Sequence, residues 1–227
     1  MWGDRDTPFN KFPIERLLKD IEIIYNNPNV AVVYFLDSCI FYMPDYAKAI
    51  IDKITTCKYK DIPTICTLDA RVLNEEMIRS LQKVNLIHNQ YQFGLQAVDP
   101  HTLKTMNRYF PLEKFKEKMD ILRKVNPKAE IGLDIIFGLP GDNYETFRNT
   151  IDFALKLRAS KIYPSPLLLL PGTPFYNDRD KYGFKIDNNP PYMVKSNNTY
   201  SKEDMQKTRS FILWVLGIMY FPAIRDT

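Results

Sequence analysis

Two hydrophobic periods alternate along the chain, one typical of helices and one typical of buried strands. Apolar residues recur at helical spacing from Ile14 to Ile24, directly after Pro13, and two asparagines with Pro28 predict the end of this helix. The next segment, Val30 to Leu36, is a continuous apolar run of strand length, as expected for a parallel strand buried on both faces. The pattern therefore begins with a helix followed by a strand.

The same alternation repeats towards the C-terminus. Further strands are predicted at residues 63–68, 91–98, 131–137 and 161–170, and further helices are predicted to begin at or near Pro44, Asn74, Pro111, Asn143 and Ser201. Asn74 and Asn143 are suitable N-caps, and Ser201 with Asp204 resembles a capping box. Residues 177–200 are rich in Asn, Asp, Tyr and Pro without a clear period. We interpret this segment as a linker or surface excursion.

Five strand-and-helix alternations predict an α/β fold with right-handed crossovers and a parallel sheet. Such a sheet is either doubly wound or curled into a barrel, and sequence periodicity does not distinguish the two. The length of 227 residues and a hydrophobic content of 45% are sufficient for one sizeable core.

Charge and cysteine content narrow the class of protein. The net charge of +4 comes from 31 basic residues scattered among 27 acidic ones, so nucleic-acid binding is not implied. Three cysteines are too few for a disulfide framework and no signal peptide opens the chain, which predicts a cytoplasmic protein. The most apolar stretch, Phe211 to Phe221, is roughly half the ~20 residues that cross a bilayer, so no membrane association is expected.

Polar side chains stand at the carboxyl ends of the predicted strands, where parallel α/β folds bind ligands. Asp37 and Ser38 follow the first strand, and Asp69 follows the second. Gln96 lies at the end of the third strand. For Asp69 a second interpretation is an ion pair with nearby Arg71.

Asp134 is the least expected of these residues, because it interrupts an apolar strand. A buried carboxylate is costly without a cation or hydrogen-bond donors. Arg108 is a candidate partner, although an arginine fork can equally hold a ligand carboxylate. Together with Gln96, the two residues could also form a buried polar network with no ligand.

Three motifs occur in a characteristic order. The first runs from Phe93 to Asp99 and continues through Met106-Asn107-Arg108; the second is Gly132 to Asp142 (GLDIIFGLPGD), and the third is Leu170 to Pro174. Together they resemble the radical S-adenosylmethionine (SAM) superfamily. The resemblance covers about residues 11 to 210 and is nearest to cobalamin-dependent members, with similarity to the oxygen-independent coproporphyrinogen oxidase and methylthiotransferase groups.

This resemblance implies an architecture and two domains. The implied fold is a partial TIM-type (β/α)6 barrel of parallel strands over residues 1–176, lacking its first strand and cluster loop. A C-terminal extension, an irregular segment followed by a helix, would occupy residues 177–227.

The resemblance also implies a SAM site. Asp37, with Ser38, stands where family members contact the SAM amino group, and Asp69 matches a glutamate that binds SAM. Gln96 matches a glutamine at the SAM ribose, and Arg108 matches an arginine at the SAM carboxylate. SAM is a zwitterion with a ribose, so its site needs an acid for the ammonium, an arginine for the carboxylate and hydrogen-bond acceptors for the ribose hydroxyls.

The second motif supplies the rest of the implied site. Asp134 matches an acid that binds ribose hydroxyls, and Gly138 with Leu139 belongs to a turn, ending at Gly141, near the adenine. Alternatively, this turn is no more than a helix entry, although backbone donors at such turns also receive anions. The resemblance identifies no catalytic residue.

The cysteines depart from the family pattern. Family members hold a [4Fe-4S] cluster with a Cys-x3-Cys-x2-Cys loop, whereas Cys39, Cys57 and Cys66 are too far apart to imitate it. They are interpreted as ordinary thiols, and no metal ligand is predicted. The cluster loop, and in cobalamin-dependent members a cobalamin domain, would lie upstream of Met1.

The expected function is that of a radical SAM iron-sulfur enzyme that cleaves SAM reductively, with cobalamin-dependent methyl transfer as one form of the chemistry. The chain by itself would be inactive without the cluster loop and would bind SAM weakly or not at all. The alternative is a non-catalytic barrel that binds a nucleotide-like ligand or a protein partner. Methylthio transfer to RNA is less expected, because that group carries extra cluster cysteines and a basic module. An open barrel edge could pair with a second copy of the chain.

Overall fold

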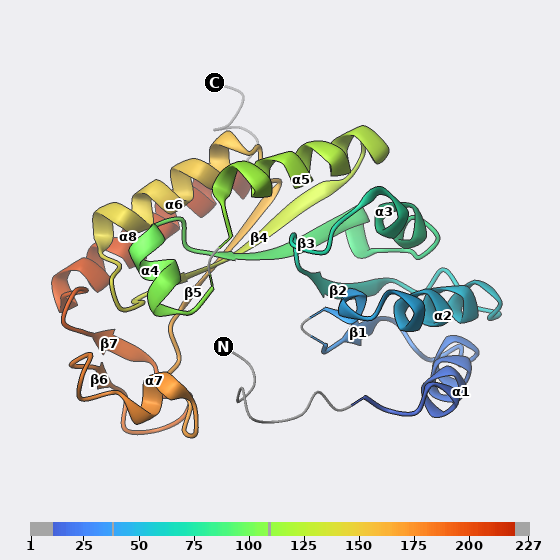
Figure 1. Ribbon diagram of the computed structural model, residues 1–227, viewed down its shortest axis with the longest axis horizontal. Helices are drawn as coiled ribbons and strands as arrows, with labels where there is room; N and C mark the ends of the chain where they lie inside the picture. The colour runs from blue at the N-terminus through green and yellow to red at the C-terminus, as the bar shows by residue number, and fades with distance from the viewer. Residues whose placement is uncertain (1–10, 38, 109, 221–227) are drawn as a thin grey trace. The chain divides into compact units, whose positions relative to one another are not determined.

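The computed structural model describes residues 11–37, 39–108 and 110–220 (Figure 1). Its main sheet contains five parallel strands in the order β1-β2-β3-β4-β5, namely β1 (Val33–Phe35), β2 (Thr64–Leu68), β3 (Gln90–Gln96), β4 (Glu130–Phe137) and β5 (Lys161–Pro166). Spatial order equals sequence order, so the sheet has no point at which the winding reverses. This order is that of an open barrel-type sheet and excludes the doubly wound alternative.

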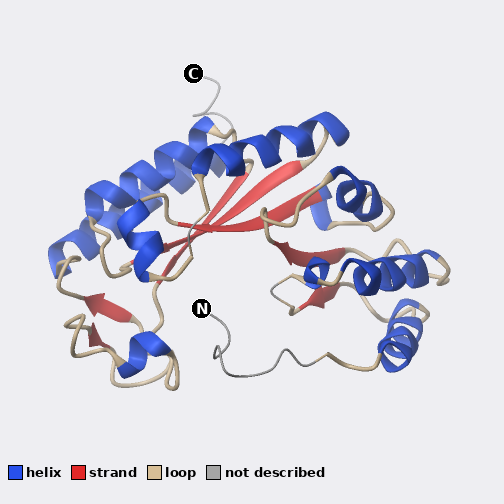
Figure 2. Ribbon diagram, in the orientation of Figure 1, coloured by secondary structure: helices blue, strands red, loops and turns tan. Residues whose placement is uncertain are grey.

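Helices separate the strands, as Figure 2 shows. They are α1 (Ile14–Tyr25), α2 (Pro44–Thr55), α3 (Glu75–Leu81), α4 (Pro100–Thr105), α5 (Leu112–Val125), α6 (Tyr144–Lys156), α7 (Pro174–Asn177) and α8 (Lys202–Tyr220), with short 3-10 turns η1 (Ile40–Tyr42) and η2 (Ile87–Asn89). The predicted α/β alternation is therefore confirmed.

The chain divides into two compact units, and each is described by itself. The α1–α3 unit comprises the described residues of 11–94 and 110–132, and the α6–α8 unit comprises those of 95–108 and 133–220. In the first, α1 packs against α2, α2 against α3 and α3 against α5. In the second, α6 and α8 lie side by side (Figure 1). The division of the chain at residue 177 stays a prediction.

The first strand differs from its sequence prediction. β1 has three residues rather than seven, and Tyr34 and Leu36 are 53% and 86% exposed. The reason is topological, because β1 lies at one edge of the described sheet and pairs only with β2. An apolar run does not reveal whether a strand is central or at an edge.

Residues 177–200 are not a linker. They contain an antiparallel hairpin of β6 (Lys185–Ile186) and β7 (Val194–Ser196), and Leu168 forms an isolated bridge with Met193. Val194 is fully buried in a cluster that includes Leu139 and Leu169. The interpretation as a surface excursion is wrong for this hairpin, because its side chains complete the core of the α6–α8 unit.

The predicted helix caps are confirmed. The Asn74 side chain accepts a hydrogen bond from the Met77 amide at 2.8 Å. Asn143 forms a reciprocal capping box with Thr146, and the Ser201 hydroxyl accepts from the Asp204 amide at 3.0 Å. These contacts fix the starts of α3, α6 and α8, two of which follow directly on strand-end loops.

Candidate ligand-binding site

The residues predicted to bind SAM fall into both units. Asp37 and Asp69 belong to the α1–α3 unit, while Gln96, Arg108, Asp134, Gly138 and Leu139 belong to the α6–α8 unit. Ser38 lies outside the described residues. Asp37 is exposed in the loop between β1 and η1.

Asp69 follows β2 and is enclosed by donors from two neighbours. Its carboxylate accepts hydrogen bonds from Arg71 Nε at 3.0 and 2.9 Å, from Arg71 Nη2 at 2.5 Å and from the Arg71 amide at 2.8 Å. The Tyr42 hydroxyl, from η1, donates a further short bond. The ion pair with Arg71 that the sequence offered as an alternative is therefore present.

The electrostatics of this cluster follow from the donors. Burial alone would raise the pKa of Asp69, but the bonds from Arg71 and Tyr42 outweigh it and lower the pKa to about 2. Burial and the bond to Asp69 raise the pKa of Tyr42 to about 12. Asp69 is ionised at neutral pH with its oxygens already engaged, so a SAM ammonium would have to compete with Arg71 for them.

Gln96 ends β3 in a strained conformation. Its φ is 68°, and the Ala97 amide bonds to the Leu95 carbonyl at 2.9 Å, which closes a γ-turn around Gln96. A left-handed conformation in a residue other than glycine costs on the order of 1–3 kcal/mol and tends to persist at functional sites. The turn bends the chain out of the sheet at this residue.

Arg108 is positioned by the end of α4. Asn107 has a φ of 52°, its amide bonds to the Lys104 carbonyl at 2.9 Å, and the Arg108 amide bonds to the Leu103 carbonyl at 2.8 Å. This pair of bonds is a Schellman motif with asparagine in the left-handed position. Arg108 is the first residue beyond the motif and is half-buried.

Asp134 lies on β4, the strand next to β3. The sequence predicted a buried apolar strand around Asp134, but this residue is half-buried, because the alternating burial of β4 places it on the more accessible face. A partly hydrated carboxylate costs less than a fully buried one.

The turn after β4 is held by residues far along the chain. Gly138 and Gly141 have φ of 84° and 89°, which favours glycine at both positions. The Asn197 side-chain amide donates to the Gly138 carbonyl at 2.9 Å, and the Gly141 amide donates to Thr199 Oγ1 at 2.8 Å. Leu139 is fully buried in the core cluster, so only its main chain could face a ligand.

Asp142 was not singled out from the sequence. It is 1% exposed; Oδ1 accepts a short hydrogen bond from the Thr146 hydroxyl, and Oδ2 has no hydrogen-bond partner among the described residues. Burial raises its pKa to about 7, against the lowering effect of bonds from Thr146 and the Asn143 amide, and the nearby charge of Asp99 adds to the rise. The sequence feature that could have drawn attention to Asp142 is its position between the glycine turn that ends at Gly141 and the helix cap at Asn143.

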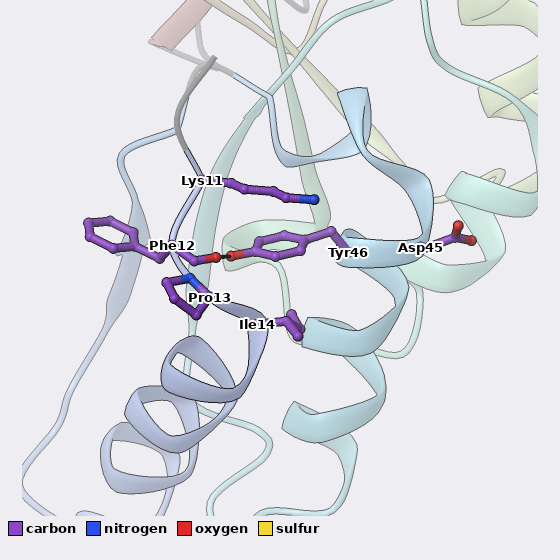
Figure 3. Close-up of a pocket in the computed structure, with 6 residues that line it drawn as sticks. All are labelled: Lys11, Phe12, Pro13, Ile14, Asp45 and Tyr46. Carbon is purple, nitrogen blue, oxygen red and sulfur yellow. Dashed lines mark hydrogen bonds between the residues drawn. The ribbon is translucent and has the colours of Figure 1, made fainter. Parts of the chain in front are cut away.

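An open pocket of about 350 Å³ lies at the starts of α1 and α2 (Figure 3). It is lined by Lys11, Phe12, Pro13, Ile14, Asp45 and Tyr46. The Tyr46 hydroxyl donates to the Phe12 carbonyl at 2.5 Å, which ties the two helix starts together. None of the predicted SAM residues lines this pocket.

The described residues do not fit an iron-sulfur cluster. Cys39, Cys57 and Cys66 are buried free thiols, and burial raises the pKa of each, that of Cys66 to about 12. Cluster binding requires thiolates. Within the described ranges, no group of three or more His, Cys, Asp or Glu side chains is arranged to hold a metal ion.

Three polar side chains of the α6–α8 unit are of the types that SAM requires. Gln96 and Asp134 offer an amide and a carboxylate for ribose hydroxyls, and Arg108 offers a guanidinium for a carboxylate.

Among the residues that the structure describes, no helix has the length and apolar character needed to span a membrane.

The sequence profile of the Radical SAM superfamily matches residues 4–154. The chain therefore belongs to this superfamily, whose enzymes use S-adenosylmethionine and a [4Fe-4S] cluster.

Relatives include tRNA-modifying enzymes. The chain is 27% identical over 124 residues to threonylcarbamoyladenosine tRNA methylthiotransferase MtaB from Bacillus subtilis, covering 55% of this chain and 28% of that protein. It is 31% identical over 100 residues to a tRNA-2-methylthio-N(6)-dimethylallyladenosine synthase from Bifidobacterium longum subsp. infantis, covering 44% and 21%. The matches thus cover less than a third of the length of either relative.

Solved structures share the fold. Coproporphyrinogen III oxidase (HemN) from Escherichia coli, a radical SAM enzyme, aligns with a TM-score of 0.62 at 15% identity, over 91% of this chain and 46% of that one. The methyltransferase TsrM from Kitasatospora setae, solved with cobalamin and a [4Fe-4S] cluster, aligns with a TM-score of 0.61 at 16% identity, over 79% and 37%. The open sheet of parallel strands is therefore that of radical SAM enzymes.

Proposed function

We propose that this chain is the SAM-binding part of a radical SAM enzyme, in which Gln96 and Asp134 contact the ribose and Arg108 the carboxylate. The observation that carries the proposal is the strained γ-turn at Gln96, at the carboxyl end of β3. The neighbouring strand β4 carries Asp134 and leads into the Gly138–Gly141 turn, for which we propose a place near the adenine.

The reaction class follows from superfamily membership. A complete site would also hold a [4Fe-4S] cluster, which would supply the electron for reductive cleavage of SAM, and in cobalamin-dependent members a cobalamin, which would carry a methyl group; the described residues of this chain do not supply the cluster ligands. The names of the tRNA methylthiotransferases and of TsrM support two reactions for the whole protein, methylthio transfer and methyl transfer. The role of this chain's own residues is to bind and orient SAM.

The proposal is tested by titrating the purified chain with SAM and following backbone amide signals by NMR. We expect weak but saturable binding, with the largest shifts at Gln96, Arg108 and Asp134. Q96A should weaken binding about tenfold through the loss of a hydrogen bond to the ligand, whereas Q206A, at an exposed glutamine on α8 of the same unit, should not change it. Saturable binding that both variants leave unchanged would contradict the assignment.

A second measurement addresses the cluster. Anaerobic reconstitution of the chain with iron and sulfide should yield no stoichiometric [4Fe-4S] cluster, because the buried thiols have raised pKa values and no suitable spacing. Absorbance near the thiolate-to-iron band is the readout. A stoichiometric cluster would show that the cysteines of this chain do bind a cluster, contrary to the prediction.

The alternative is a non-catalytic barrel that binds a nucleotide-like ligand or a protein partner. The observation that supports this alternative is that the described residues supply no cluster ligands. It predicts that adenosine binds as tightly as SAM, since a simple nucleoside site gains nothing from the methionyl group. Competition between SAM and adenosine in the NMR titration separates the two functions.

A further inference from the structure

Among the described residues, the hydrogen bonds of the Arg71 side chain lie along one edge of its guanidinium, whose carbon is also 5.9 Å from the centroid of the Tyr42 ring. The Nε and Nη2 groups of Arg71 donate to Asp69 and to the Tyr42 hydroxyl, the latter at 2.7 Å. Within the described ranges, Nη1 makes no hydrogen bond, and the side chain is 46% exposed. The guanidinium is therefore fixed along one edge while the donors of Nη1 remain available.

The position of Arg71 in the α1–α3 unit is also informative. β1 and β2 pair in parallel, with Val33 opposite Thr64 and Phe35 opposite Cys66, so both strands end at the same edge. The loop after β1 leads to η1, which carries Tyr42, and the turn after β2 carries Asp69 and Arg71. This is the edge at which open parallel sheets bind ligands.

We propose that Arg71 is an oxyanion-binding residue, whose Nη1 donors receive a carboxylate or phosphate oxygen of a ligand. Asp69 and Tyr42 are positioning residues, since they fix the plane of the fork before the ligand arrives. Preorganisation lowers the entropy cost that a long flexible side chain otherwise incurs on binding. Asp69 neutralises the charge of Arg71, so the selectivity for oxyanions comes from aligned donors rather than from net charge.

Oxyanion binding at Arg71 does not require the proposed SAM contacts, but a SAM carboxylate found at Arg71 would replace its assignment to Arg108. The oxyanion at Arg71 has two potential sources: the carboxylate of SAM or an anionic group on a second reactant. S-methyl-5'-thioadenosine distinguishes them, because it keeps the adenosine of SAM and lacks the aminocarboxylate.

The test uses the chain labelled with 15N-arginine and follows the Nε–H signals by NMR during titration with inorganic phosphate. The Arg71 signal is assigned from its loss in R71K. Arg79 is the matched control, because it also faces a carboxylate, that of Glu75 at 3.5 Å, but on the exposed surface of α3. We expect a saturable shift at Arg71, none at Arg79, and about fivefold weaker phosphate binding in R71K, because lysine lacks the planar fork.

Separate titrations with SAM and S-methyl-5'-thioadenosine identify the source. A shift at Arg71 with SAM and not with S-methyl-5'-thioadenosine supports the SAM carboxylate, and a shift with phosphate alone supports a second reactant. Y42F should weaken phosphate binding about twofold while the Arg71 signal remains visible. The proposal is overturned if no probe moves the Arg71 signal of the unmodified chain, or if Arg79 responds as strongly.

Discussion

Asp69 and Asp142 both follow a parallel strand by a few residues, yet their carboxyl groups are in opposite electrostatic states. Asp69 has a guanidinium and a phenol within hydrogen-bond distance and a pKa of about 2, whereas Asp142 has hydroxyl and amide donors, an oxygen without a partner among the described residues and a pKa of about 7. Both are nearly inaccessible, at 7% and 1% exposure. The difference shows that a cationic partner can outweigh burial and keep a strand-end acid charged, whereas burial without such a partner raises the pKa of the acid towards neutral pH.

The largest expected effect concerns Asp142. Its pKa is raised in the folded protein, so its contribution to stability is complete below about pH 4 and is lost as the pH rises through about 7. D142N should remove this pH dependence, on the order of 3 kcal/mol between pH 4 and pH 8. Urea unfolding at several pH values measures it.

Asp99 provides the control for that experiment. D99N keeps a side-chain cap on α4, where Asp99 Oδ1 now accepts from the Thr102 amide at 2.8 Å, but removes a nearby negative charge. The midpoint of the pH-dependent change should move to lower pH and its amplitude should shrink. An unchanged profile in both D142N and D99N would place the titrating group elsewhere.

The second effect concerns Asp69. R71A leaves a nearly buried carboxylate with only the phenol, and it should lower the free energy of unfolding at pH 7 by about 2 kcal/mol, a figure reduced for the half-exposed arginine. Since the pKa of Asp69 is lowered, this stability is present above about pH 4 and lost as the pH falls towards 2. R79A, at an exposed pair, should cost less than about 0.5 kcal/mol. Equal losses of unfolding free energy in R71A and R79A would show that the Asp69–Arg71 pair contributes no more than an exposed ion pair.

The third effect tests the turn that leads to Asp142. A Cβ at Gly141 would lie 2.8 Å from His101 Cδ2 and 3.4 Å from the Thr102 Cα, whereas one at Gly172 meets nothing within 4 Å. Both glycines have positive φ, so G141A should cost about 1 kcal/mol more than G172A in urea unfolding. Combining G141A with H101A should recover part of this difference in unfolding free energy, because the contact with the imidazole is removed. If nothing is recovered, the destabilisation by G141A comes from backbone strain instead.

The smallest effect distinguishes the contribution of the Tyr42 phenol to the environment of Asp69 from that of the Arg71 guanidinium. Y42F should lower the free energy of unfolding by about 0.5–1 kcal/mol and raise the pKa of Asp69 towards its usual range, because one donor to the carboxylate is lost. Carboxyl 13C signals followed against pH measure the shift. A pKa that stays near 2 would show that Arg71 alone is sufficient.

Features set by neighbours in sequence were predictable. The caps at Asn74 and Asn143, the pairing of Asp69 with Arg71 and the α/β alternation all depend on residues a few positions apart or on local periodicity. The locations of Gln96 at the end of β3 and of Asp134 within β4 followed from the same pattern, while their roles as SAM contacts stay predictions.

Features set by distant residues were not predictable. The exposure of Tyr34 depends on the place of β1 in the sheet, and the burial of Val194 depends on a core built from several elements. Likewise, the raised pKa of Asp142 depends on complete burial near Asp99. The left-handed conformation of Gln96 had no sequence signal, because glutamine is not a residue that favours it.

Asn197 joins segments that are synthesised at different times. Its amide group reaches the Gly138 carbonyl, 59 residues earlier, and its carbonyl oxygen accepts from the Thr199 and Tyr200 amides. As the nascent chain leaves the ribosome, β4 and its turn emerge well before this clamp is available, and closing so long a loop carries an entropic cost. The turn after β4 can therefore reach its final geometry only after the segment that follows β7, with Asn197, has been synthesised.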